Sequence, residues 1–549
     1  MLTYDHYFDS EERGKIIADF QKEYPDLIRS ETILKTEEGK DVLAVTISNF
    51  KNGDPSDKPA FYVDGNTHAG EVTGMMVSMY LIDYLLSNYG KNDEVNYLMD
   101  SFTFYVIPCI SPDGSDTYLH TPNILRSVNR DYNKEIGGLY KKDMDDDGVI
   151  RMMRIKSRSG KFKIKEDNPD LMVPRAADDV NGTFYDVYTE GEIEDYDGVN
   201  IKVAKEAWCL DFNRNYPFGW FNDFRQSGAG PYPLSNKETK AVVDFVIAHP
   251  NICSVLTNHT SGGVLLTPPG TYSAKKAPEY DVAVYKELGK LCKKTCGYKD
   301  SNIFDGFVTD QENYDSGAFD DWCYETKGVF ATTLELWNLE ERAGMPNVWG
   351  KIETLEEECQ RMEKCYGWIK ENYPEGFKSW EKFNHPQLGE VEIGGFDIKH
   401  TFQNPPEKFL EQELVKATNF ALKFASLLPN VELVSCKKEN IGDNIYKVEA
   451  IIENTGYLPT YISDKAKMIK ANKGITCKIN GEVLEGKNEV EIGELSSYSK
   501  TESTAMFYGN IATFNSDPIR KKISFIVRSD EDIVLEISGN KIFNKKIKL

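Results

Sequence analysis

Residues 58–86 read KPAFYVDGNTHAGEVTGMMVSMYLIDYLL, and this stretch decides the class of fold. The apolar run at residues 60–63 predicts a buried strand, and the Asp-Gly-Asn that follows it predicts a turn. From Glu71 onward Met, Ile and Leu recur at helical spacing, which predicts a helix over residues 71–86 with one broad apolar face. His68 and Glu71 therefore lie where a strand gives way to a helix.

The alternation of strands and helices continues along the chain. Further strands are expected at residues 42–48, 102–110, 252–257 and 329–336, and a further helix at 282–295. This order predicts an α/β fold with a mixed, mostly parallel sheet flanked by helices. In open sheets of that type, ligands bind beyond the carboxyl ends of the strands.

Two parts of the chain depart from this order. Residues 130–208 are rich in Asp, Gly, Lys and Arg, and they predict an irregular insertion. Beyond Pro429, short alternating segments separated by Gly and Asn predict a β-sandwich. We therefore expect a main α/β domain over residues 1–429 and an accessory β-sandwich over residues 430–549.

Net charge and cysteine content limit the classes of partner the protein is expected to bind, and they indicate its cellular compartment. The formal net charge of −23 argues against nucleic acid or an anionic membrane as the main partner, because both would be repelled. The N-terminus lacks the pattern of a signal peptide, and no apolar run is long enough to span a bilayer. The ten cysteines include no C-x-x-C pair. These features predict a reduced, cytoplasmic protein, or a secreted one if a leader has been removed. They leave the oligomeric state open.

His68, Glu71 and His259 form a candidate metal site. Residues three apart share one side of a helical turn, so His68 and Glu71 can both reach one ion. His259 follows the strand expected at residues 252–257. Two imidazoles and a carboxylate, with a fourth position open, are typical of catalytic zinc. Taken alone, H-x-x-E fits equally well an exposed His beside a Glu that complements a helix dipole.

Two further segments carry polar groups that are typical of a substrate-binding or catalytic site. Asn213 and Arg214 can together clamp a carboxylate, although an ordinary surface loop would contain the same residues. Glu335 lies near the end of an apolar strand, where a carboxylate is costly to bury without a partner. A salt-bridged edge residue is the alternative for Glu335.

Taken in chain order, these candidate residues resemble the site residues of the zinc carboxypeptidase family, which includes pancreatic carboxypeptidases A and B. The resemblance covers about residues 30–370. It runs from H-x-x-E through the segment RMMR at residues 151–154, and then through Asn213-Arg214, His259 and Glu335. The stretch around His259, LSNKETKAVVDFVIAHPNICSVLTNHTSGGVLLTPPG, resembles the family over its whole length.

The resemblance implies how the reaction is carried out. His68, Glu71 and His259 bind one zinc ion, and zinc lowers the pKa of a coordinated water to about 7. Glu335 acts as the general base, and it later delivers the proton to the leaving amine. The implied activity is hydrolysis of a C-terminal peptide bond, and the implied partner is a peptide or small amide with a free carboxylate.

The resemblance also implies the substrate contacts. Arg154 polarises the scissile carbonyl and stabilises the oxyanion, and Arg151 belongs to the same segment as a further substrate-binding residue. Asn213 and Arg214 hold the terminal carboxylate of the substrate. Tyr314 is the candidate for the tyrosine that covers the substrate, although its position is shifted by one residue.

Asp320 is the candidate selector of the substrate's C-terminal side chain. The resemblance places it at the bottom of the pocket for that side chain, where a carboxylate favours Lys or Arg. The alternative is an Asp that caps a turn or pairs with a nearby Lys such as Lys327.

Two other functions and one other metal remain open at this stage. The same fold serves deacylases and murein-peptide amidases, and an inactive relative could bind peptides or sugars. The presence of all three ligands and of Glu335 counts against an inactive relative. Residues 143–148, DMDDDG, resemble the first half of a calcium loop, but Arg154 occupies the position of its bidentate Glu. A solvated acidic turn is an equally good interpretation.

Overall fold

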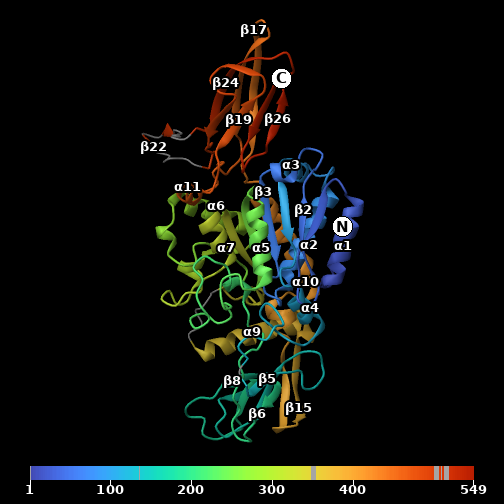
Figure 1. The fold of residues 1–549 in the computed structure, drawn as a ribbon. Coiled ribbons are helices and arrows are strands. Elements are labelled where there is room, and N and C mark those ends of the chain that lie inside the picture. Colours follow the sequence, from blue (N-terminus) through green and yellow to red (C-terminus); the bar gives the residue numbers. More distant parts are fainter. Residues whose placement is uncertain (1, 135, 348–353, 500–505, 508–509, 512–517) are drawn as a thin grey trace.

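The computed structural model describes residues 2–134, 136–347, 354–499, 506–507, 510–511 and 518–549. An α/β part forms the middle of the molecule, with β-strands of the C-terminal part at one end and a smaller antiparallel sheet at the other (Figure 1). None of the helices in these residues is long and apolar enough to cross a membrane.

The central sheet has eight strands in the order β1-β2-β4-β3-β11-β14-β12-β13. Its four middle strands, β4, β3, β11 and β14, run parallel, whereas β1, β2 and β12 each pair antiparallel with a neighbour. The expected mixed, mostly parallel sheet is thus confirmed. The bounds are β1 (Ile28–Lys35), β2 (Asp41–Ile47), β3 (Ala60–Gly65), β4 (Thr103–Ile107), β11 (Ile252–Thr260), β12 (Val264–Thr267), β13 (Lys299–Asn302) and β14 (Phe330–Leu336).

Helices flank the central sheet (Figure 1). The α-helices are α1 (Ser10–Glu23), α2 (Val72–Asn88), α3 (Asp93–Ser101), α4 (Pro112–His120), α5 (Lys237–Ala248), α6 (Glu279–Thr295), α7 (Phe319–Trp322), α8 (Leu339–Arg342), α9 (Leu355–Asn372), α10 (Glu407–Ala425) and α11 (Asp464–Ile469). Shorter or irregular helical turns are η1 (Pro55–Asp57), η2 (Phe212–Arg214), η3 (Ala274–Lys276), η4 (Ile303–Phe307), η5 (Cys323–Lys327), η6 (Pro374–Gly376) and η7 (Lys399–Gln403).

Two apolar cores lie on opposite faces of the sheet, because side chains alternate along each strand. On β3, Phe61 and Val63 belong to the core that contains α2, while Tyr62 belongs to the core beneath α5. The methionine-rich face of α2 is fully buried against the sheet and α10, as its helical spacing predicted. Burial on both faces fixes the carboxyl ends of the strands relative to one another.

The insertion at residues 130–208 is more regular than expected. Its strands join a six-stranded antiparallel sheet in the order β15-β16-β6-β9-β7-β8, and a two-stranded sheet of β10 and β5. The bounds are β5 (Gly138–Lys141), β6 (Met152–Lys156), β7 (Phe162–Lys165), β8 (Asn168–Pro174), β9 (Tyr185–Thr189), β10 (Gly191–Glu194), β15 (Phe377–His385) and β16 (Gly389–Phe396). The sheet was not predicted from the sequence, because its strands are short and polar and because two of them come from a distant part of the chain.

The C-terminal part contains two four-stranded antiparallel sheets, ordered β17-β18-β24-β20 and β21-β19-β25-β26. Val448 and Phe525 of one sheet share a core with Cys477 and Leu535 of the other, so the sheets pack face to face as a sandwich. The bounds are β17 (Val431–Gly442), β18 (Ile445–Asn454), β19 (Ile475–Ile479), β20 (Glu482–Glu485), β21 (Glu489–Gly493), β22 (Met506–Phe507), β23 (Asn510–Ile511), β24 (Arg520–Arg528), β25 (Val534–Ser538) and β26 (Lys545–Lys548).

Candidate active site

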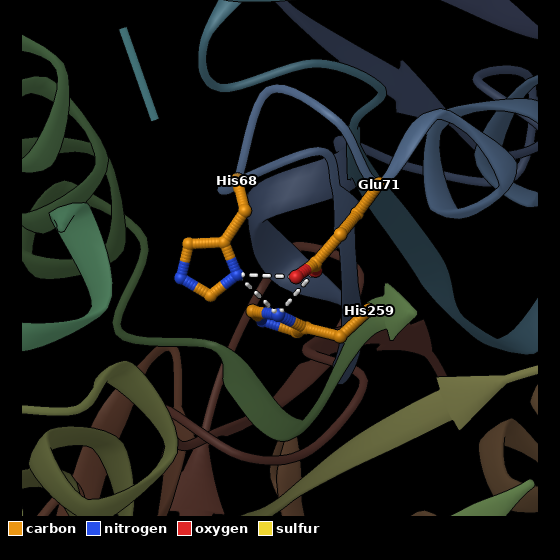
Figure 2. A group of neighbouring side chains, drawn as sticks. All are labelled: His68, Glu71 and His259. Carbon is orange, nitrogen blue, oxygen red and sulfur yellow. Dashed lines mark hydrogen bonds and ion pairs between the residues drawn. The ribbon is translucent and has the colours of Figure 1, made fainter. Parts of the chain in front are cut away.

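Three side chains meet at the carboxyl ends of β3 and β11. His68 lies in the turn after β3, Glu71 is the N-cap residue of α2, and His259 lies near the end of β11. The turn holds its shape because Asn66 adopts a positive φ of 55° and its side-chain amide donates to the carbonyls of His68 and Ala69. Since β3 and β11 are adjacent parallel strands, their ends place the two histidines side by side (Figure 2).

The ligand atoms of this group all lie within 4.8 Å of one another. The Nδ1 atom of His68 is 2.7 Å from Glu71 Oε1, and the Nδ1 atom of His259 is 2.8 Å from Glu71 Oε2. The two Nδ1 atoms are 3.2 Å apart (Figure 2). Burial alone would raise the pKa of Glu71, but the two imidazoles hold that pKa well below its usual range.

This donor set fits a zinc ion. Two imidazole nitrogens and one carboxylate converge on a single point, and the adjoining cavity leaves room for further ligands. Zinc is thus the ion that the site suits.

Asp211 orients the His68 ring. Its Oδ1 atom lies 3.0 Å from His68 Nε2, which leaves Nδ1 free to face the ligand group. Burial would lower the pKa of His68, and Arg126 acts in the same direction, but the carboxylates of Glu71 and Asp211 raise it. No sequence pattern indicated this role for Asp211, because the contact spans 143 positions.

Arg126 places a guanidinium beside the metal-binding residues, and no sequence pattern indicated it. Its Nε atom donates to Asp211 Oδ2 at 2.9 Å, and its Nη1 atom lies 3.6 Å from Glu71 Oε1. The backbone carbonyl of Arg126 accepts from Ala69 N at 2.8 Å, so the residue is tied to the metal-binding turn. Its side chain lines the same cavity as His68 and Glu335.

Arg154 and Arg151 do not lie at this site, and the roles expected for them are corrected. Arg154 lies on β6 in the six-stranded sheet, where its Nε atom donates to Glu392 Oε2 at 2.8 Å. Its guanidinium lies 4.5 Å from the centre of the Trp380 ring. Arg151 donates to Asp147 Oδ2 at 3.1 Å and to the Gly395 carbonyl at 3.0 Å. Both arginines stabilise the sheet. The sequence-based prediction placed the catalytic arginine at residue 154, inside the insertion, whereas the arginine at the site, Arg126, comes before the insertion.

Glu335 faces the metal group from the neighbouring strand. It pairs in register with His259 across the parallel strands β11 and β14, and it lines the cavity. Poor solvation raises the pKa of Glu335 to about 8; His259 opposes this rise, and the Glu71 carboxylate adds to it. The role of Glu335 as general base stays a prediction.

Asn213 and Arg214 line the cavity from η2. The Asn213 side-chain oxygen accepts from Phe319 N at 2.9 Å, which joins η2 to α7. The Arg214 Nη2 atom lies 3.3 Å from the exposed Asp315 carboxylate. Asp315 lines the same cavity, so the Arg214 guanidinium already has an exposed carboxylate of the chain beside it.

Tyr314 lines the outer part of the cavity. Its ring centre lies 5.6 Å from that of Phe221 and 5.7 Å from that of Phe304, and the Arg225 guanidinium is 5.3 Å away. The backbone just beyond it is fixed by Gln226, whose amide group makes two hydrogen bonds of 2.7 Å to Ser316. Tyr314 thus lines the cavity, and its role as the residue that covers the substrate stays a prediction.

Asp320 and Asp321 form the inner end of the cavity, whose volume is about 400 Å³. Each is 2% exposed. Thr333 Oγ1 donates to Asp320 Oδ2 at 2.7 Å, and Gly270 N donates to Asp321 Oδ1 at 2.8 Å. Burial, and then the adjacent Asp320 carboxylate, raise the pKa of Asp321 well above its usual value. This inner end is acidic and enclosed.

Asn404 supports the metal-binding turn from behind, and no sequence pattern indicated it. Its Nδ2 atom donates to the Gly70 carbonyl at 2.8 Å, and its Oδ1 atom accepts from Thr73 N at 3.1 Å. These two backbone groups flank Glu71. Asn404 is fully buried.

The acidic loop for which calcium binding and a solvated turn were both left open brings Asp143, Asp145 and Asp147 together, with carboxylate oxygens within 4.8 Å of one another. The Lys378 ammonium lies 2.7 Å from Asp145 Oδ2 and 3.0 Å from Asp147 Oδ2. A positive charge of the chain thus already lies beside two of the carboxylates. Calcium binding stays a prediction.

Comparison with known proteins identifies the family. Residues 15–361 match the family model described as zinc carboxypeptidase, which is more than half of the chain. The chain belongs to the zinc carboxypeptidase family. Residues 430–549 match a second model, described only as a domain of unknown function.

Individual members of the zinc carboxypeptidase family share limited sequence identity with this chain. The chain is 25% identical to carboxypeptidase B of Bos taurus over 343 residues, which is 61% of this chain and 64% of that one. It is 26% identical to carboxypeptidase D of Mus musculus over 155 residues, or 28% of this chain and 9% of the relative. The chain thus spans less than two thirds of these relatives.

Two solved structures are also similar. Thrombin activatable fibrinolysis inhibitor matches with a TM-score of 0.45 and 16% identity, over 77% of this chain and 74% of that one. Carboxypeptidase A from Helicoverpa armigera matches with a TM-score of 0.40 and 17% identity, over 67% of this chain and 73% of that one.

Proposed function

We propose that this protein is a zinc-dependent carboxypeptidase that removes a basic residue from the C-terminus of a peptide. The observation that carries the proposal is one cavity whose lining includes His68 and His259 of the metal group together with Glu335, Arg214 and Asp320. One zinc ion per chain, held by His68, Glu71 and His259, is part of the proposal. A cytoplasmic location is also proposed and awaits a test.

The metal supplies one part of the chemistry. A bound zinc ion acts as a Lewis acid that acidifies water and polarises a carbonyl oxygen. The residues described above hold its ligands in place. Asp211 fixes the tautomer of His68, and Asn404 fixes the backbone on both sides of Glu71.

Glu335 and Arg126 do the work of proton transfer and charge stabilisation. Glu335 accepts a proton from the attacking water and then gives it to the amine that leaves, so it ends the cycle in its starting form. The Arg126 guanidinium faces the cavity and provides positive charge where the oxyanion of the tetrahedral intermediate forms.

The remaining residues determine which bond is cleaved. Arg214 and Asn213 bind the terminal carboxylate, and this contact restricts cleavage to the last peptide bond. The substrate's last side chain extends toward Asp320 and Asp321. An enclosed acidic end favours Lys or Arg, because a carboxylate without a cationic partner is costly to desolvate.

The test compares peptides that differ only in their last residue, which is Arg, Lys, Leu or Phe. The Asp320→Asn variant removes the charge and keeps a group that Thr333 can bond. We expect the wild type to prefer Arg and Lys, and the variant to lose about 100-fold in kcat/KM on those peptides alone.

The exposed Asp244 on α5, which pairs with Lys240 and does not line the cavity, provides the control, because Asp244→Asn makes the same change of side chain outside the cavity. Its profile should equal that of the wild type. A wild-type preference for Leu or Phe would contradict the basic specificity. Full activity after exhaustive chelation, with no zinc in the protein, would contradict the zinc-dependent reaction itself.

A further inference from the structure

The short helix α11 of the C-terminal part lies directly on the segment that follows the acidic end of the cavity. Ser463 precedes α11, and its hydroxyl donates to the Gly328 carbonyl at 2.5 Å. A Cβ atom added to Gly328 would lie 2.4 Å from Cα of Ala466, so the two backbones are in close contact. The segment beneath α11, η5, joins α7 to β14, and these two elements carry Asp320 and Glu335.

A second set of contacts fixes the start of α11 to α6. The Asp281 carboxylate accepts from the backbone nitrogens of Asp464 and Lys465 at 2.7 and 2.9 Å. The same carboxylate accepts from the Tyr324 hydroxyl at 2.9 Å, and Tyr324 belongs to η5. The position of α11 is therefore determined by the α/β part as well as by its own chain.

Lys465 enters the α/β part from this helix. Its Nζ atom lies 2.7 Å from Glu325 Oε2, and the two side chains are only 11% and 7% exposed. Glu325 Oε1 accepts from the Tyr272 hydroxyl at 2.7 Å, and Lys465 Nζ lies 3.3 Å from the same hydroxyl. The three groups form a closed polar triangle, which is stable only while each charged member keeps its partner.

This triangle connects with the end of the cavity along two routes. Glu325 is four residues after Asp321 on the continuous helical segment formed by α7 and η5. Tyr272 is two residues after Gly270, whose backbone nitrogen donates to Asp321 Oδ1. A Cβ atom added to Gly270 would lie 2.6 Å from Asp321 Oδ2, so the loop and the carboxylate fit closely.

We propose that Lys465 is a positioning residue for the substrate side-chain pocket. Through Glu325 and Tyr272 it holds the Asp321 carboxylate and the Gly270 loop in place. The C-terminal part of the chain then supports the specificity pocket from outside the cavity, through α11. This inference rests on the proposed function of the cavity, because it assigns the substrate's last side chain to its acidic end.

The test uses variants of the full-length zinc enzyme. Lys465→Met removes the ammonium, and Lys465→Arg restores a cation. The double variant Lys465→Met/Glu325→Met removes both charges, so that neither is left buried alone. Lys467→Met is the matched control, because Lys467 lies on the same helix but its ammonium packs on the Tyr461 ring at 3.6 Å.

Two peptides that differ only in a final Arg or Ala are compared. In Lys465→Met we expect KM for the Arg peptide to rise about tenfold, with kcat/KM for the Ala peptide within about twofold of the wild type. The double variant should show a similar rise, Lys465→Arg should be close to the wild type, and Lys467→Met should not differ from it. Equal losses on both peptides, or the same loss in Lys467→Met, would overturn the inference.

Amide hydrogen exchange separates this inference from the proposed function, because it needs no substrate. Exchange at residues 319–327 and 270–272 should rise in Lys465→Met and stay unchanged in Lys467→Met. Unchanged exchange in Lys465→Met overturns the positioning role whatever the enzyme does. A wild type that cleaves neither peptide, with the expected rise in exchange in Lys465→Met, would refute the proposed function and leave the structural link intact.

Discussion

Replacing Arg126 with Ala tests the assignment that differs most from the sequence-based expectation. Arg126 faces the cavity and contributes one hydrogen bond to Asp211. Loss of one preorganised group that stabilises an oxyanion lowers kcat by roughly 100- to 1000-fold, or about 2.7–4 kcal/mol. Asp211 keeps two partners, His68 and the backbone nitrogen of Asn213, so we expect zinc to remain bound at stoichiometric zinc concentrations.

The assay measures kcat and KM on a peptide ending in Arg, together with zinc content and the thermal midpoint. Arg154→Met is the matched control. It removes a guanidinium that is paired with Glu392 in the six-stranded sheet, so it should lower stability by about 1–3 kcal/mol while kcat stays near that of the wild type. If Arg126→Ala kept more than about a tenth of kcat, or if Arg154→Met lost kcat equally, the reasoning would be refuted.

Three further predictions concern the general base, one metal ligand and a buried carboxyl group. Glu335→Gln should keep zinc and KM but lower kcat by about 100- to 10,000-fold, since an amide cannot accept the water's proton; near-normal kcat would make Glu335 structural. His259→Ala should lose zinc in a competition with a chelator while its circular dichroism spectrum stays native, and retention of zinc would remove His259 from the ligand set. Burial raises the pKa of Glu190 to about 7. Because this folded-state pKa lies above the unfolded value of 4.5, its contribution to stability is present below about pH 4.5 and is lost as the pH rises through 7. Urea unfolding of Glu190→Gln should therefore depend less on pH in that window, and an unchanged dependence would contradict the shift.

The strand-turn-helix at residues 58–86 could be predicted because three independent signals coincide there. These signals are a short apolar run, a turn and a helical repeat of apolar residues. The observed elements, β3 and α2, lie within two residues of the expected bounds. The ligands could be predicted as well, because the ends of parallel strands converge at one edge of a sheet.

The errors arose where contacts connect distant segments. Arg126 and Arg154 are both arginines near apolar residues, and only the fold shows that one reaches the metal turn while the other lies in a separate sheet. Asn404 acts across 331 positions through backbone groups, which leave no trace in residue type. The strands of the insertion were missed because their partners, β15 and β16, follow some two hundred residues later.

The pairing of β6 with β16 has a consequence for how the chain can be divided. Residues 15–361 match the zinc carboxypeptidase model, but β16 begins at Gly389 and Asn404 follows it. A fragment cut at residue 361 would leave one side of β6 without hydrogen-bond partners, and such an unpaired edge promotes aggregation. It would also lose the amide that braces both sides of Glu71. The region that defines the family is therefore shorter than the smallest piece of this chain that we expect to fold and bind metal.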